Sequence, residues 1–140
     1  MNTRDQKYAA TIYEQVSQVK SLSDADQKKY GSMAHKLPIL IRKAGLVQAL
    51  TFVQARGGVD NQATNAYHHL LDHIAKTLEI KNDGETSRRQ VLLEKARTAP
   101  LNEYMQLSQQ VMTTLLWYKR FAQMVLGVEA NDTDSTEGGN

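Results

Sequence analysis

The chain has 140 residues and a mass of 15.7 kDa, which is the size of one domain. It contains no cysteine, so disulfides, thiolate metal sites and cysteine nucleophiles are excluded. Four acids follow Val128 with no base among them; without these four, residues 1–128 carry 17 basic and 11 acidic side chains, a net charge of +6. A mildly basic body is compatible with binding a polyanion, although composition alone favours an ordinary soluble surface.

Two helices are predicted in the first third of the chain. Thr3 and Gln6 have the spacing of a capping box at the start of the first helix, and Ser23 with Asp26 marks the start of the second. Pro38 lies inside the second helix. It should kink that helix or occupy the first turn of a new one.

Glycine and asparagine divide the middle of the chain into shorter helices. Gly45 should end the second helix, and a strongly apolar helix is expected over residues 46–56. Asn61 is the expected cap of a fourth helix. An Asn-Asp-Gly turn then leads to a short fifth helix that begins at Ser87.

The last helix is the longest and is expected over residues 100–126. Its predicted inner face consists of Leu101, Tyr104, Ser108, Met112, Leu115, Ala122 and Leu126. Lys119 falls within that arc, where it must reach solvent, pair with a carboxylate or face a partner's phosphate. Trp117 and Met124 fall on the polar outer face. They suggest a protein contact, with packing of Trp117 on a neighbouring helix as the alternative.

These patterns predict an all-α protein, a compact bundle of about six helices. We expect a single helical domain over residues 1–128 and a disordered acidic tail over residues 129–140. No apolar run approaches the ~20 residues that a membrane span needs, and the first residues lack a hydrophobic signal core. The expected location is therefore cytoplasmic, without membrane contact.

The sequence shows no pattern of catalytic residues. Phosphate-loop, dinucleotide-binding, nucleophile-elbow and zinc-protease motifs are all missing. His69 and His73 share a helix face, but that face is expected to be solvated, and no third metal ligand is evident. We therefore expect no enzyme activity, no metal and no cofactor.

Basic residues recur along the second predicted helix. Lys29, Lys36 and Lys43 are seven residues apart and form a line beside the apolar face if the helix is nearly continuous. Such a line could follow a nucleic-acid backbone, although lysines beside an apolar stripe also simply reach for solvent. The far side of the helix is expected to carry Lys28, His35 and Arg42.

Two segments, residues 28–56 and 104–123, carry a resemblance to a known family. The matching features in chain order are Arg4 to Ala9, Lys29-Tyr30-Gly31, Leu37-Pro38, Ile41-Arg42, Gly45-Leu46, Phe52, Trp117 and Lys119-Arg120-Phe121-Ala122. Their order and spacing resemble the small α-helical subunit of the type III-B CRISPR effector, the Cmr complex.

The resemblance implies a non-catalytic subunit of an antiviral ribonucleoprotein. Its partners would be the backbone and large Cmr subunits, guide RNA and target RNA, and neighbouring copies of itself stacked along the guide-RNA filament. The candidate RNA-binding residues are Lys36, Arg42, Lys43 and Arg56, followed by Lys119 and Arg120. Stacking of identical subunits requires two different patches, and Trp117 with Met124 is the candidate for one of them.

Two further interpretations stay open beside this one. The chain could be a helical protein–protein adaptor whose charges only keep it soluble. It could also be a DNA-binding regulator that uses the helices on either side of Gly45. The apolar character of residues 46–53 and the position of Pro38 argue against the regulator, because a recognition helix presents polar residues to the groove.

Overall fold

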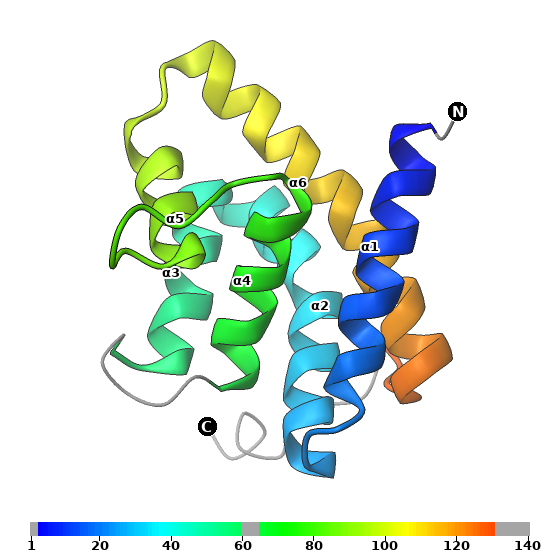
Figure 1. Ribbon diagram of the computed structural model, residues 1–140. Coiled ribbons are helices and arrows are strands. Elements are labelled where there is room, and N and C mark those ends of the chain that lie inside the picture. Colours follow the sequence, from blue (N-terminus) through cyan, green and yellow to red (C-terminus); the bar gives the residue numbers. More distant parts are fainter. Residues whose placement is uncertain (1–2, 60–64, 131–140) are drawn as a thin grey trace.

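The computed structural model describes residues 3–59 and 65–130, which form six α-helices and a π-helical turn (Figure 1). The helices are α1 (Arg4–Val19), α2 (Asp24–Ala44), α3 (Leu46–Gly57), α4 (Ala66–Thr77), α5 (Arg88–Thr98) and α6 (Leu101–Phe121), and the turn is η1 (Ala122–Leu126). Apart from one isolated β-bridge, no strand occurs in these residues. The predicted all-α bundle is thereby confirmed, whereas the predicted disordered tail lies outside the described residues from position 131 onward.

Local capping interactions set most helix starts. Capping boxes form between Thr3 and Gln6 and between Ser87 and Gln90, where each side chain bonds to the backbone of the other residue. The prediction for the fourth helix was misplaced. Asn65 caps α4 by accepting hydrogen bonds from two backbone N–H groups, and Asn61 lies outside the described residues.

Helix α2 continues through Pro38 and ends at Gly45. It therefore neither stops nor restarts at the proline, and it buries nine of its residues against neighbouring helices. Gly45 has φ 89°, a conformation that glycine adopts without a steric penalty, and it ends α2 and begins α3. No side chain caps α3 from within it. The hydroxyl of Tyr104 on α6 instead accepts hydrogen bonds from the N–H groups of Leu46 and Val47, at 3.1 and 3.3 Å.

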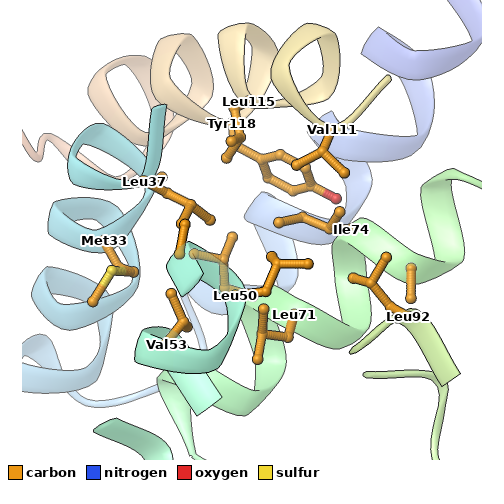
Figure 2. Close-up of a cluster of buried hydrophobic side chains, with 14 of the residues drawn as sticks. Met33, Leu37, Leu50, Val53, Leu71, Ile74, Leu92, Val111, Leu115 and Tyr118 are labelled. Carbon is orange, nitrogen blue, oxygen red and sulfur yellow. The ribbon is translucent and has the colours of Figure 1, made fainter. Parts of the chain in front are cut away.

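The hydrophobic core lies where α2, α3, α4 and α6 meet (Figure 2). Side chains from all of these helices and from α5 interdigitate there, including Met33, Leu37, Leu50, Val53, Leu71, Ile74, Leu92, Val111, Leu115 and Tyr118. A buried polar group joins α1, α4 and α6 beside this core. Tyr118 donates a hydrogen bond of 2.6 Å to Gln15, and the hydroxyl of Thr77 lies 3.0 Å from that of Tyr118.

The inner face of α6 differs from the predicted face. The buried residues of α6 and η1 are Leu107, Val111, Thr114, Leu115, Tyr118 and Ala122. Leu101 is 70% exposed. Tyr104, Ser108, Met112 and Leu126 are only half-buried. The actual stripe includes Thr114 and Tyr118, whose hydroxyls find hydrogen-bond partners inside the protein, so hydrophobicity alone did not reveal it.

Val128 fixes the end of the described chain to α2. It is 5% exposed, and its carbonyl accepts a 3.0 Å hydrogen bond from Nε2 of His35. Gly31, one turn before His35, leaves the space that the valine side chain fills. The far side of α2, where the sequence places His35, is therefore not exposed, because Val128 covers it.

Candidate nucleic-acid interface

Helix α2 carries the first group of predicted RNA-binding residues. Because it is one continuous helix, Lys29, Lys36 and Lys43 keep a common register along it. Lys43 and Arg42 are located at its end, where Lys43 is exposed, while Lys29 and Lys36 are half-buried. In the described part of the chain, neither Arg42 nor Lys43 has a carboxylate partner, so both charges are available to an anion.

Arg56 stands at the end of α3 and is held against α4. Its guanidinium carbon lies 5.6 Å from the centre of the Tyr67 ring, and one of its nitrogens donates a 3.5 Å hydrogen bond to the Tyr67 hydroxyl. These two contacts with Tyr67 restrain the Arg56 side chain. A phosphate contact by Arg56 would therefore be made while its guanidinium lies against Tyr67.

Aromatic and basic residues gather where α1 meets the end of α6. Trp117 stacks on Phe121 with ring centres 5.8 Å apart, and Tyr13 meets Phe121 edge-on at 5.4 Å. The Arg120 guanidinium lies 5.2 Å from the Trp117 ring. Trp117 is therefore half-buried by its own chain, whereas Met124 is 65% exposed.

Lys119 occupies a half-buried position in the last turn of α6. Among the described residues it has no carboxylate partner. Of the three environments predicted for it, pairing with an acid is thus not observed in this part of the chain. Its ammonium group is left to reach solvent or a partner.

Five of the six predicted RNA-binding cations share one local position, the last turn of a helix. Arg42 and Lys43 end α2, Arg56 ends α3, and Lys119 and Arg120 end α6. Positive charge at that position offsets the helix dipole, typically by about 0.3–1 kcal/mol each. The positions of these five residues therefore have a structural explanation independent of any ligand.

The predicted cations do not converge on one surface. Figure 1 shows α3 ending at the lower left of the molecule and α6 ending at the lower right. Arg56 is thus separated from Lys119 and Arg120 by the body of the bundle. Arg42 with Lys43 and Lys119 with Arg120 form two separate pairs.

The histidines of α4 do not form the solvated face that the sequence predicted. His73 is half-buried, and its Nδ1 lies 2.7 Å from the hydroxyl of Tyr30 on α2. Burial, and then the charges of His69 and Lys76, lower the pKa of His73 to about 4. His68 is fully buried and donates a hydrogen bond to the carbonyl of Gly58.

Three cations that were not predicted line one groove. Arg4 and Lys7 of α1 and Lys76 of α4 border a hollow of about 670 Å³, together with Tyr8 and Gln110. The spacing of Arg4 and Lys7 could have placed both on one helix face. Lys76 could not have been added to them, because only the packing of α1 beside α4 brings it there.

Metal ligands and membrane-spanning helices are not found in the part of the chain that the structure describes. Within residues 3–59 and 65–130, no group of three or more His, Asp or Glu side chains is placed to hold a metal ion. None of the described helices combines the length and the apolar character of a membrane-spanning segment.

Comparison with known proteins gives concordant results. Residues 4–125 match the family model described as CRISPR-associated protein (Cas_Cmr5). A curated Thermus thermophilus protein, the CRISPR system Cmr subunit Cmr5, is 36% identical over 126 residues, which are 90% of this chain and 98% of that protein. The crystal structure of a CRISPR-associated Cmr5 family protein from Thermus thermophilus matches with a TM-score of 0.70 and 37% identity. That match covers 89% of this chain and 98% of the other.

Proposed function

The chain belongs to the Cmr5 family of CRISPR-associated proteins, and on that premise we propose that it is a non-catalytic Cmr subunit that contacts guide and target RNA through basic side chains. A cytoplasmic location is part of this proposal. In RNA-guided recognition, base pairing reads the sequence, so a bound protein needs only complementary shape and charge. A small helical bundle with exposed cations is sufficient for that task.

The observation that carries this proposal is the pair Arg42 and Lys43. The two residues are adjacent at the end of a helix, and neither has a carboxylate partner among the described residues. The helix is continuous and also aligns Lys29 and Lys36. Cations that bind phosphates release counterions, so the resulting affinity should fall steeply with salt.

The other predicted cations have secondary places in this proposal. Arg56 would meet a phosphate while stacked on Tyr67, and Lys119 would do so from its half-buried site beside Arg120. Each such contact is weak alone. Several copies held in one filament would add their contributions through a high effective concentration.

Self-stacking is the protein-contact part of the proposal. Met124 is exposed and the half-buried Trp117 lies beside Arg120, so the end of α6 can supply one of the two unlike patches that a head-to-tail stack needs. Stacking on Phe121 restrains Trp117 within this patch.

The proposal is tested by purifying a tagged copy from its native host, after ultraviolet cross-linking, with sequencing of attached RNA and identification of co-purified proteins. We expect short RNAs that share a repeat-derived 5′ end, a large subunit and a repeated backbone subunit. Cross-links should map to this chain itself. Recovery of those proteins with no RNA cross-linked to this chain would overturn direct RNA contact.

A second candidate, a protein–protein adaptor without RNA contact, is favoured by one observation. The outer surface of α6 and η1 exposes four large apolar side chains, Leu101, Met105, Leu116 and Met124, which are 50–70% accessible. Exposed apolar groups along one helix are typical of a protein interface. The same cross-linking experiment separates the two functions, because an adaptor would co-purify proteins and carry no RNA.

A further inference from the structure

We propose that the groove between α1 and α4 is a phosphate-binding surface for RNA, in which Arg4, Lys7 and Lys76 contact the backbone. This inference rests on the proposed function. It places RNA contact on a surface that contains none of the predicted RNA-binding residues. The hollow measures about 670 Å³ and is bordered by α1 on one side and by the end of α4 on the other. Figure 1 shows these two helices facing one another, with α6 behind them.

The α1 wall of the groove is one continuous helix face. Arg4, Lys7 and Thr11 follow one another at spacings of three and four residues, which places them in a row. Arg4 also lies over the Tyr8 ring, 5.8 Å from its centre, so its guanidinium is held at the groove. This wall presents two cations and a hydroxyl to anything that enters.

The two cations of α1 stand against the helix dipole. Arg4 is the first residue of α1 and Lys7 follows one turn later, at the end where acids are favoured and cations are not. Helix stability therefore does not explain them, in contrast to the five predicted cations in last turns. Lys7 and Lys76 have no carboxylate partner among the described residues, so both charges are available to an external anion.

The α4 wall adds a third cation and one acid. Lys76 is exposed in the last turn of α4, and Glu79 lies just beyond that helix. With Arg4 and Lys7 opposite, the lining has three positive groups and one negative group. The charge of the groove is thus complementary to phosphate, and the charge of an acidic polymer suits it better than an apolar or basic partner.

The groove continues into a second hollow, and this favours an extended ligand over a single ion. A space of about 760 Å³ along α6 shares Arg4 with the first, and Gln110 borders both. Its other lining residues include amides, hydroxyls and thioethers, such as Gln106, Gln109, Ser108, Thr113 and Met105. A strand could place phosphates against the cations while its sugars and bases meet the amide groups, which donate and accept hydrogen bonds.

The test compares two double variants in the assembled effector with its guide RNA and a labelled target RNA. Lys7→Ala with Lys76→Ala removes two groove cations, and Lys20→Ala with Lys81→Ala removes two exposed lysines outside it. Both lower the net charge equally. We expect the groove variant to bind target RNA more weakly and to reduce the steepness of the slope of log affinity against log salt concentration by about one to two. The control variant should match wild type in both.

The outcomes are distinguishable from failure of the proposed function. Equal affinity and equal salt dependence for the two double variants would overturn the groove while leaving RNA contact by Arg42 and Lys43 intact. Loss of subunit incorporation in the groove variant, with unchanged RNA affinity of the assembled fraction, would assign the groove to a protein partner and also overturn it. If wild-type protein itself cross-links to no RNA, the proposed function fails first. Thermal unfolding of each variant shows whether it is folded.

Discussion

The hydroxyl of Tyr30 lies 2.7 Å from Nδ1 of His73, which ties α2 to α4 at the edge of the core. Their rings meet edge-on with centres 5.6 Å apart. Burial raises the pKa of Tyr30 well above its ordinary value, so the phenol keeps its proton and donates it in a hydrogen bond to a neutral imidazole. A protonated His73 would lose this acceptor and carry an uncompensated charge.

This pair makes stability depend on pH below neutrality. The pKa of His73 is about 4 in the folded protein and 6.5 without burial, so between these values the unfolded chain binds a proton that the folded chain does not. The contribution of His73 to the free energy of unfolding is fully present above pH 6.5 and is lost towards pH 4. The loss is at most about 1.4 kcal/mol per pH unit and of order 3 kcal/mol in all. Urea unfolding of wild type and His73→Gln from about pH 7.5 to about pH 4.5 should show the steeper loss in wild type. Parallel curves would contradict this assignment.

Interactions between near neighbours in sequence were predictable, and those between helices were not. The capping pairs Thr3–Gln6 and Ser87–Gln90 span three residues each, so sequence spacing was enough. The hydrogen-bond partner of His73 is Tyr30, which is 43 positions away in the sequence. A helical register calculation correctly places it opposite the main apolar stripe of α4 but cannot show that α2 covers that side.

The candidate site shows the same division. The positions of cations such as Arg42 and Lys43 at a helix end can be predicted from one helix and its C-terminal cap. The groove cations combine α1 with α4, and no local pattern links Arg4 to Lys76. The α6 stripe was misread for a different reason: Thr114 and Tyr118 are polar by type, yet their hydroxyls are paired inside the bundle.

Replacing Gly31 should reveal how tightly Val128 is packed. A methyl group at Gly31 would lie 2.7–2.9 Å from three Val128 side-chain atoms, so Gly31→Ala should destabilise the protein by about 1–3 kcal/mol through overpacking. In a Val128→Gly background the clash disappears. There the same change should stabilise by about 0.5–1 kcal/mol, because alanine favours a helix over glycine. Denaturant unfolding of the four proteins measures this reversal of sign, and its absence would show that Val128 moves freely.

Tyr104 should stabilise the start of α3 from another helix. Tyr104→Phe removes the hydroxyl that accepts from the N–H groups of Leu46 and Val47. Leaving these donors without a partner should cost about 1–3 kcal/mol. Amide hydrogen exchange at residues 46 and 47 should accelerate in the variant. Tyr13→Phe, at a residue 48% exposed, is the matched control and should leave both stability and exchange unchanged.

Trp117 and Met124 should respond differently to substitution. Trp117→Ala removes a stacking partner of Phe121 and the surface beneath Arg120, so we expect it to lower the unfolding free energy by about 1–3 kcal/mol as well as to affect assembly. Met124→Ser changes an exposed side chain and should leave stability within about 0.5 kcal/mol of wild type. A loss of incorporation into the effector by Met124→Ser would then identify a contact. Normal incorporation would remove Met124 from the interface.

The double variant Arg42→Ala with Lys43→Ala separates the helix-dipole role from the RNA role. Both residues lie in the last turn of α2, so their loss should lower stability by about 0.6–2 kcal/mol if the dipole contributions add. Substitution by glutamine removes the same charges and has the same dipole effect, while retaining hydrogen-bonding groups. If the pair contacts phosphates, both versions should weaken target-RNA binding in the assembled effector. They should also reduce the steepness of the slope of log affinity against log salt concentration by about one to two. The corresponding change at Lys95 and Arg97, also in a last turn, should reproduce the stability loss without the binding loss. Equal binding by wild type and the Arg42–Lys43 variants would leave the helix dipole as the reason for these two charges.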